Sequence, residues 1–336
     1  MLKVDNLSKV YRVGTFGGKE LRAVSNVNFQ IIPGEIVSLI GESGSGKSTI
    51  GKMILRLIPK SSGAIVFNEA DISTFRRREL KEYYRHVQGV FQDPFSSYNP
   101  IFKADRVFRL VRNEFFPGIN DADWNEKINR SVSAVGLNPE QVLEKFPHQL
   151  SGGQLQRLLI ARALLLDVQF LVADEIISML DASTRIDVLN LLADLKSQGL
   201  SVLFITHDLS LGYYISERAM ILHRGYIVEM GATEKIYDTP LHPYTQTLIA
   251  SVPRLDKKWE DVDIETRVKA RDIQLPAGWG YFDSMAPVPQ NSERASSEPA
   301  LIEVEPNHFV ACVRRPDAHF DHGEPVEVTD NRIIHR

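Results

Sequence analysis

The most specific chemical pattern in the chain is GESGSGKS at residues 41–48, which fits the phosphate-binding spacing G-x-x-x-x-G-K-[ST]. In this pattern the glycines let backbone amides point at phosphate oxygens, and Lys47 brings a full positive charge to the β- and γ-phosphates. The hydroxyl of Ser48 suits Mg²⁺ as a ligand. The loop therefore predicts a site for a nucleoside triphosphate with its magnesium ion.

The segments on either side of the loop fit this prediction. An apolar run at residues 36–40 is typical of a buried strand, and the residues after the loop predict an apolar helix that ends at about Leu57, before Pro59. The alternative, a flexible glycine–serine linker, does not require a strand before it and a helix after it. The N-terminus of that helix adds a partial positive charge where the phosphates bind.

A second anion-binding element is predicted at residues 150–154, which read LSGGQ. Ser151 suits the N-cap of a helix that starts near Gln154, and Gly152 and Gly153 leave the first amides of that helix uncovered. Taken alone, Ser-Gly-Gly is a common linker. In a chain that already has a phosphate loop, its place before an amphipathic helix favours a phosphate site.

Two carboxylates and a histidine follow predicted buried strands. Residues 170–175 read FLVADE, so that Asp174 is placed to hold Mg²⁺ through its water shell and Glu175 to orient or deprotonate an attacking water. His207 follows the strand at 202–205 and is placed to donate to the γ-phosphate. The alternatives are solvated acids at a strand end and a structural histidine.

These residues must be positioned by a mixed fold. The apolar runs at 170–173 and 202–205 flank a helical pattern at 183–196, which makes a βαβ unit and predicts a parallel sheet covered by helices. Residues 96–166 predict a mostly helical insertion. Its helices include one capped by Asp121 or Asp123 that stops at Gly136, one from about Pro139 and one from about Gln154.

Composition limits the remaining possibilities. The chain has 336 residues and a net charge of -4, so no bulk positive field favours nucleic acid as a partner. No apolar run approaches the roughly 20 residues of a membrane-spanning helix, and residues 1–10 lack a signal-peptide core. The single cysteine, Cys312, excludes an intrachain disulfide. Residues 284–307 are rich in Pro, Ser and Glu and predict a loop or an irregular extension.

Taken together and in this order, the motifs resemble those of the ATP-binding subunit of an ABC transporter. The resemblance implies that ATP is contacted by the Walker A residues Gly41, Ser43, Gly44, Ser45, Gly46, Lys47, Ser48 and Thr49, with Tyr11 stacking on adenine. It implies that Mg²⁺ is held by Ser48, the Q-loop residue Gln92 and the Walker B residue Asp174. Catalysis is then assigned to Glu175, His207 and Gln92, the D-loop to Asp181, and the signature that contacts a partner subunit's ATP to Ser151, Gly152, Gly153 and Gln154.

Two further segments, FQDPFSSYNP at 91–100 and YDTPLHPYTQTLIASVP at 237–253, resemble the oligopeptide/dipeptide-importer branch of this family. The branch takes up peptides, and some members take up oligosaccharides or nickel. The resemblance implies an ATPase at the cytoplasmic face of the cell membrane. Its implied partners are a second ATPase subunit, two membrane-spanning permease subunits and an extracytoplasmic solute-binding protein. The residues after Glu175, Ile176 and Ile177, suggest that the second ATPase subunit is a different chain.

The chain departs from the family pattern at three places. Ile176 and Ile177 replace the usual Pro-Thr after the catalytic glutamate, and Tyr98 replaces a more usual Leu. Many members hold an iron–sulfur cluster on several C-terminal cysteines, but one thiolate cannot do so, and we expect no cluster. A zinc site would need an unusual spacing. Its imaginable ligands are His308, Cys312, His319 and His322, and the three histidines are instead expected to be scattered on the surface.

The resemblance implies a P-loop NTPase (RecA-like) α/β core with an antiparallel β subdomain and an α-helical subdomain at about 96–166. The ATPase domain is expected over 1–255 and a C-terminal extension over 256–336. One alternative is a catalytically weak, structural half of an asymmetric ATPase pair, which Ile176 and Ile177 keep open. Another is a soluble ABC ATPase of DNA repair or translation. The single Walker A loop and the lack of a heptad run between Gln92 and Ser151 argue against it.

Overall fold

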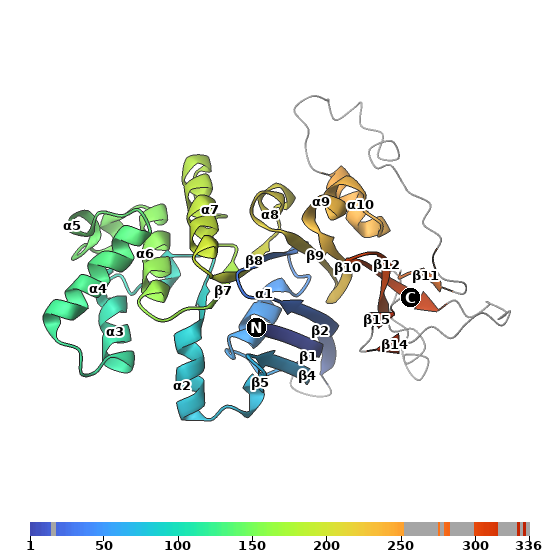
Figure 1. Ribbon diagram of the computed structural model, residues 1–336, viewed down its shortest axis with the longest axis horizontal. Helices are drawn as coiled ribbons and strands as arrows, with labels where there is room; N and C mark the ends of the chain where they lie inside the picture. The colour runs from blue at the N-terminus through green and yellow to red at the C-terminus, as the bar shows by residue number, and fades with distance from the viewer. Residues whose placement is uncertain are drawn as a thin grey trace. The chain divides into compact units, whose positions relative to one another are not determined.

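The computed structural model describes residues 1–14, 18–251, 275, 279–282, 299–314, 328–329 and 332–333. The chain divides into two compact units (Figure 1). The first contains Met1–Ile31, Val37–Ser73 and Thr206–Arg336, and the second contains Ile32–Ile36 and Thr74–Ile205. Within the described residues, no helix combines the length and the apolar character needed to cross a bilayer.

The first unit opens with an antiparallel sheet. Its strands are β1 (Leu2–Val13), β2 (Lys19–Ile31), β4 (Ser62–Phe67) and β5 (Ala70–Asp71), in the order β2-β1-β4-β5. Leu2, Val4 and Leu7 of β1 are buried while the residues between them are more exposed, as expected for a sheet with one face on a core. The expected antiparallel β subdomain is therefore present.

A second group of strands in the first unit begins at β3 (Ile36–Ile40), which pairs in parallel with β9 (Arg218–His223). From β9 the pairing runs antiparallel through β10 (Tyr226–Ala232) and β13 (His308–Arg314), and β13 also pairs with β12 (Ala300–Glu305) and β11 (Trp279–Tyr281). The short strands β15 (Arg332–Ile333) and β14 (Val328–Thr329) continue from β12. The helices of this unit are α1 (Lys47–Ile54), α8 (Leu209–Ile215), α9 (Thr233–Asp238) and α10 (Pro243–Ala250).

The second unit has the predicted parallel strands, β6 (Val87–Val90), β7 (Phe170–Asp174) and β8 (Ser201–Thr206), in the order β6-β7-β8. Every residue of β7 and β8 is buried, and α7 (Ala182–Ser197) connects them, which confirms the βαβ unit. The predicted helical insertion lies between β6 and β7. The helices of this unit are α2 (Arg77–His86), α3 (Arg106–Phe115), α4 (Asp121–Ala134), α5 (Pro139–Val142) and α6 (Gly152–Leu164), with 3₁₀ turns at Phe95–Ser97 and Pro147–Gln149 between them. A further 3₁₀ turn, Ile72–Thr74, lies where the chain passes from the first unit to the second.

Two helix boundaries differ from the sequence prediction. Helix α1 ends at Ile54 because Arg56 has a positive φ of 52°, and the amides of Arg56 and Leu57 donate to the carbonyls of Met53 and Lys52 in a Schellman motif. Helix α4 is capped by Asn120, whose side chain accepts from the amide of Asp123, and not by Asp121 or Asp123. Both errors concern which of several neighbouring residues ends the helix, a choice that local composition does not fix.

The prediction of an irregular segment over 284–307 is wrong at its C-terminal end, and residues 284–298 lie outside the described part. Residues 300–305, which read ALIEVE, form β12. Leu301 and Ile302 are buried, and Ile302 packs with Val310, Cys312 and Leu241 in a small apolar cluster. The pairing of β12 with β13 therefore overrides the loop-like composition of the residues before it.

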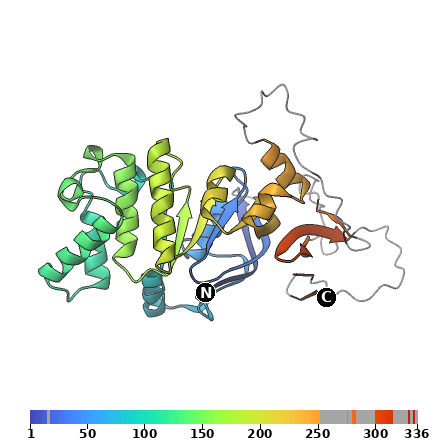
Figure 2. The ribbon, with the colours of Figure 1, turned by 45° about the horizontal axis from the view of Figure 1, so that its top comes forward.

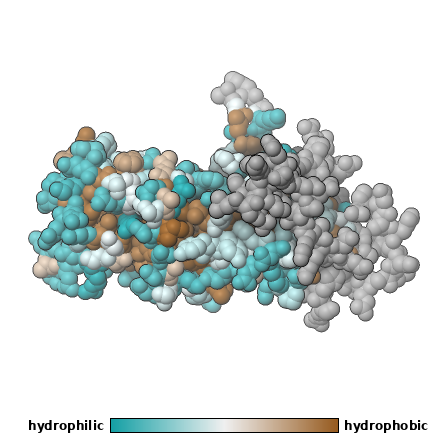
Figure 3. Space-filling model, turned by 90° about the horizontal axis from the view of Figure 1, so that it is seen from above, coloured by the Kyte–Doolittle hydropathy of each residue, from teal (hydrophilic) through white to brown (hydrophobic). Residues whose placement is uncertain are grey.

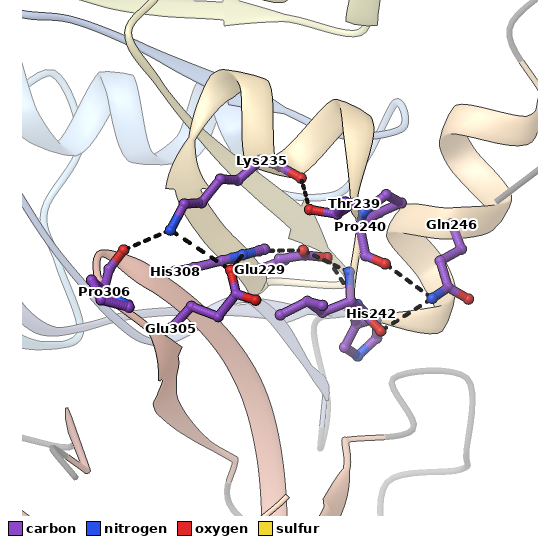
Figure 4. A network of polar contacts seen from close by, with 10 residues as sticks. Glu229, Lys235, Thr239, Pro240, His242, Gln246, Glu305, Pro306 and His308 are labelled. Atoms are coloured by element: carbon purple, nitrogen blue, oxygen red, sulfur yellow. Dashed lines mark hydrogen bonds and ion pairs between the residues drawn. The ribbon is translucent and has the colours of Figure 1, made fainter. Parts of the chain in front are cut away.

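The prediction that His308 lies on the surface is also wrong, because His308 is fully buried on β13, as is Cys312. His319 and His322 lie outside the described residues. The Nε2 of His308 lies 2.8 Å from an oxygen of Glu229, a carboxylate with no exposed surface. Figure 4 shows the two side chains meeting. The same carboxylate accepts from the amides of Leu241 at 2.8 Å and His242 at 2.9 Å. These contacts satisfy a buried charge, as burial requires, and tie β13 to β10 and to the start of α10.

We predict that His308→Ala lowers the free energy of unfolding of the chain by about 3 kcal/mol, because it removes one partner of a buried carboxylate. The loss stays at the low end of the range for broken buried pairs, since two backbone amides remain on Glu229. Urea unfolding of the purified chain measures it. The control is His148→Ala, an exposed histidine in the second unit, for which we expect a change within about 0.5 kcal/mol. A loss below 1 kcal/mol for His308→Ala would contradict this account.

Candidate functional site

The Walker A loop connects β3 to α1 and encloses the ammonium group of Lys47. The Lys47 side chain is only 5% exposed, and its Nζ donates to the carbonyls of Gly41 at 2.7 Å and Glu42 at 2.8 Å. The amide of Ser45 donates to the same Glu42 carbonyl at 3.2 Å, which closes the turn. A buried cation is therefore fixed at the N-terminus of α1, where the helix also favours negative charge.

Gly46 has a backbone conformation that residues other than glycine do not adopt without strain. Its φ is +113°, and a Cβ at this position would lie 2.3 Å from the carbonyl oxygen of Ala23 on β2. The absence of a side chain thus lets the loop pack directly on β2. At Gly44 the corresponding position is open, and the buried hydroxyl of Ser45 makes no hydrogen bond with any described residue. An open loop with a buried cation and an unpaired hydroxyl fits the phosphates of a nucleotide.

Tyr11 belongs to the same unit as this loop. Lys9 and Tyr11 of β1 pair with Val24 and Leu21 of β2, and Ala23, which abuts Gly46, lies between those two β2 residues. The Lys9 ammonium lies 4.9 Å from the centre of the half-buried Tyr11 ring and donates to the carbonyl of Pro59. Tyr11 and Gly46 therefore lie against nearby residues of β2, and the stacking of Tyr11 on adenine stays a prediction.

His207 also belongs to the first unit, directly after β8. Its side chain is exposed, and the next residue, Asp208, caps α8 by accepting from the amides of Ser210 and Leu211. The amide of Asp208 donates to the hydroxyl of Thr206 at 3.0 Å. His207 is therefore presented at a fixed junction between a strand and a helix.

The Walker B acids lie in the second unit at the end of β7. Asp174 is 6% exposed, while Glu175 is half-buried and has a positive φ of 50°. The amide of Glu175 donates to the carbonyl of Ile205 at 2.9 Å, and its own carbonyl accepts from the amide and the hydroxyl of Ser178. A non-glycine residue with positive φ costs roughly 1–3 kcal/mol and persists where its surroundings fix it, which is common at functional sites.

Ile176 and Ile177, which replace Pro-Thr, do not disrupt this turn. Their side chains are 1% and 2% exposed and contribute to the core, and the carbonyl of Ile177 accepts from the amide of Leu180 at 3.2 Å. The guanidinium of Arg185 then donates to the carbonyls of Leu180 at 2.8 Å and Ser178 at 3.2 Å. The segment after Glu175 is therefore closed by apolar burial and by Arg185, a residue that the sequence did not single out.

The signature segment has the predicted capping geometry. The hydroxyl of Ser151 accepts from the amide of Gln154 at 3.2 Å, and the side chain of Gln154 accepts from the amide of Ser151 at 2.9 Å. This reciprocal capping box starts α6 at Gly152, two residues before the predicted start. The amides of Gly152 and Gly153 belong to the first turn, where no carbonyl of the helix can accept from them. They are the donors that an anion would use.

The D-loop residue Asp181 caps α7. Its carboxylate accepts from the hydroxyl of Ser183 at 2.6 Å and from the hydroxyl and amide of Thr184 at 2.7 and 3.0 Å. These hydrogen bonds hold the pKa of Asp181 well below its usual range. Helices α6 and α7 lie side by side in Figures 1 and 2, and a Cβ on Gly153 would come within 2.5 Å of the Thr184 methyl group. The signature and the D-loop therefore meet within this unit.

Gln92 is exposed just after β6, in a segment that is attached to α6. Gln156 donates to the carbonyl of Phe91 at 3.3 Å, and Arg162 donates to that of Gly89 at 2.8 Å. Tyr98, the departure from Leu, donates its hydroxyl to the carbonyl of Leu155 at 3.1 Å, and burial raises the pKa of this hydroxyl. The sequence could have indicated Gln156 and Arg162 as polar residues within an apolar helix, but it did not show their partners.

We predict that alanine at the two signature glycines changes the stability of the chain differently. Gly153→Ala is expected to lower the free energy of unfolding by about 1–2 kcal/mol, because Thr184 is fixed by Asp181 and cannot turn away. Gly152→Ala serves as the matched control. Its Cβ would meet Phe95 and Leu180 at 3.7 and 3.8 Å, so the change is expected to be neutral or slightly stabilising. Denaturant unfolding of both variants measures the two changes. Equal losses of unfolding free energy would refute the contact between Gly153 and Thr184.

Comparisons with known proteins identify relatives of this chain. The family model described as ABC transporter matches residues 24–178, and the model described as oligopeptide/dipeptide transporter, C-terminal region, matches residues 228–283. A putative peptide import ATP-binding protein of Brucella ovis is 39% identical over 319 residues, which cover 94% of this chain and 98% of that protein. The oligopeptide transport ATP-binding protein OppF of Streptococcus pyogenes serotype M1 is 40% identical over 296 residues, which cover 88% and 90% of the two chains.

Solved structures are similar to the ATPase part of the chain. A dimeric, post-hydrolysis structure of the ATP-binding cassette MJ0796 bound to ADP and Pi superposes with a TM-score of 0.62 at 29% identity. The match covers 69% of this chain and 99% of that cassette. The predicted P-loop NTPase fold is thereby confirmed. With its nucleotide-binding loop and its close relatives, the chain belongs to the ATP-binding proteins of the ABC transporter family.

Proposed function

We propose that this chain is the ATP-binding subunit of a peptide importer and that it hydrolyses ATP to drive uptake through separate membrane subunits. The observation that carries the proposal is the Walker A loop, in which a buried Lys47 ammonium is held at the N-terminus of α1. The names of the relatives, peptide import and oligopeptide transport ATP-binding proteins, supply the solute class. They give no support to oligosaccharides, which the resemblance also allowed.

In this proposal each site residue has a distinct task. Lys47 and the loop amides bind the β- and γ-phosphates, and Tyr11 stacks on the adenine. Ser48, Gln92 and Asp174 would hold Mg²⁺, and the ion would neutralise phosphate charge. Glu175 accepts the proton of the attacking water and His207 donates a hydrogen bond to the γ-phosphate. The buried Asp174 and the strained backbone of Glu175 support these assignments.

The signature segment is proposed to grip the γ-phosphate of an ATP molecule bound by a partner ATPase subunit. Its support is the first turn of α6, where Gly152 and Gly153 carry amides without intrahelical acceptors. Hydrolysis would remove charge that both subunits contact and so weaken their association. A ligand shifts such an equilibrium only by its different affinity for the two states, and typical couplings of about 1–3 kcal/mol correspond to roughly 5–150-fold.

The proposal includes two permease subunits, a second and different ATPase subunit and an extracytoplasmic solute-binding protein, with this chain at the cytoplasmic face of the membrane. Figure 3 shows apolar side chains reaching one face of the molecule among hydrophilic ones. In the second unit, large apolar side chains are exposed in and after the Q-loop segment: Phe95, Ile101, Phe102 and Leu110. Exposed apolar side chains of this size suit contacts with a partner protein.

The alternative of a catalytically weak partner receives no support from the fold around Glu175. Ile176 and Ile177 are buried, and the turn that follows the catalytic residue is closed by hydrogen bonds. The two substitutions therefore change the core beside the site while Glu175 and His207 keep their places after β7 and β8. We accordingly assign hydrolysis to this chain's own site.

Glu175→Gln is predicted to keep ATP binding and to slow hydrolysis by about 10²–10⁴-fold, because the amide cannot accept the proton of the water. Single-turnover hydrolysis in the assembled complex measures this rate. Glu126→Gln, an exposed substitution on α4, is the control and should hydrolyse ATP at the original rate. Unchanged turnover in Glu175→Gln would exclude it as the general base.

Lys47→Ala is predicted to weaken ATP binding by about 1.5–3 kcal/mol, or roughly 12–150-fold, because it removes charged hydrogen bonds to phosphate. Equilibrium titration of the purified chain with a fluorescent ATP analogue measures the affinity. Lys52→Ala changes an exposed lysine of the same helix and should bind the analogue normally. Equal affinities for both variants and the original chain would remove Lys47 from the binding site.

A further inference from the structure

The tip of the β9–β10 hairpin is attached to the Walker A loop. The amide of Gly225 donates to the carbonyl of Ser45 at 2.8 Å, and the carbonyl of Gly225 accepts from the amide of Ser25 at 2.9 Å. Gly225 therefore links the phosphate loop to β2 through backbone hydrogen bonds alone. His223, two residues earlier, is the last residue of β9 and is 4% exposed. The conformation of this tip fixes one side of the phosphate loop.

The imidazole of His223 is covered by the aromatic ring of Tyr244. The two rings are stacked, with centroids 3.8 Å apart and planes inclined by 20°. Burial lowers the pKa of His223 and raises the pKa of Tyr244 to about 12. A Cβ on Gly41 of the Walker A loop would lie 2.1 Å from the carbonyl oxygen of Leu222, the residue before His223. The stack therefore lies beside the phosphate loop.

Tyr244 is itself held in place by the C-terminal region. Its amide donates to the Nδ1 of His242 at 3.1 Å, and the amide of His242 donates to the buried carboxylate of Glu229 at 2.9 Å. The other ring nitrogen of His242 lies 2.8 Å from the carbonyl of Phe282, and Glu229 contacts His308. The start of α10 is thus fixed from several sides (Figure 4), and the Tyr244 ring is set against His223 by contacts with β10 and β13.

We infer that Tyr244 is a positioning residue for the Walker A loop, holding the β9–β10 tip against that loop through its ring stack on His223 and so setting the affinity for ATP. The inference rests on the proposed function, because it concerns the same nucleotide site. It gives the C-terminal region a role in nucleotide binding. Since Tyr244 touches neither the water nor the γ-phosphate in this account, its loss should affect binding and leave the rate of hydrolysis of bound ATP unchanged.

The test is a double-mutant cycle on ATP affinity with the full-length chain. Tyr244→Ala and His223→Ala are each expected to raise the Kd for a fluorescent ATP analogue by about 2- to 13-fold, the range for one aromatic pair. The double variant should bind no more weakly than the weaker single variant, because both changes remove the same contact. Tyr244→Phe keeps the ring and should restore the original Kd within about twofold. In the assembled complex, Tyr244→Ala should raise KM for ATP while kcat is retained.

The matched control is Tyr237→Ala, which truncates another half-buried tyrosine, on α9, whose hydroxyl donates to the carbonyl of Leu209. This variant should lose stability and keep the original Kd. Three results would overturn the inference. They are an unchanged Kd in Tyr244→Ala, additive effects on Kd in the cycle, and a loss of ATP affinity in Tyr237→Ala equal to that in Tyr244→Ala. A loss of ATP affinity in Tyr244→Phe equal to that in Tyr244→Ala would show that the hydroxyl acts and not the ring, and would overturn the inference.

The Lys47→Ala variant separates this inference from the proposed function. If Lys47→Ala also binds the ATP analogue normally, the proposed function fails. If only Lys47→Ala is impaired, the inference alone fails.

Discussion

A buried cation is the constraint on which the phosphate loop depends. An ammonium group removed from water is costly unless its protons are donated to fixed acceptors, and Lys47 donates to the carbonyls of Gly41 and Glu42. Those carbonyls are aimed inward because β3 is fully buried on one side of the loop and Gly46 packs on β2 on the other. The loop, its two flanking elements and the β9–β10 tip therefore form one preorganised anion site.

A different arrangement governs the second unit, where short polar contacts join motifs that are far apart in sequence. The Q-loop segment is attached to α6 through Tyr98, Gln156 and Arg162, and the start of α6 contacts the cap of α7 through Gly153 and Thr184. Because these contacts are packed and hydrogen-bonded, a displacement of one motif requires a displacement of the others. This gives a physical basis for the proposed coupling between nucleotide contacts and membrane subunits.

Prediction from the sequence succeeded where a feature is local. The buried strands β3, β7 and β8, the βαβ unit and the Ser151 cap follow from runs of apolar residues and from side chains that bond to their own helix. It failed at the end of α1 and at the cap of α4, because several neighbouring residues could each end the helix. It also failed at β12, because pairing with the distant strand β13 makes that segment a strand. The positions of Tyr11 and Glu175 are consistent with the roles assigned to them, and those roles stay predictions.

The sequence by itself determined the kind of site, because a phosphate loop, a helix cap and a strand ending in two acids are each encoded within a few consecutive residues. Only the tertiary structure decided that His308 is buried on Glu229, that Tyr244 covers His223 and that Thr184 lies against Gly153. These contacts join residues from 21 to 79 positions apart or depend on how two helices pack. No short pattern encodes such contacts, since they are fixed by the packing of whole elements against one another.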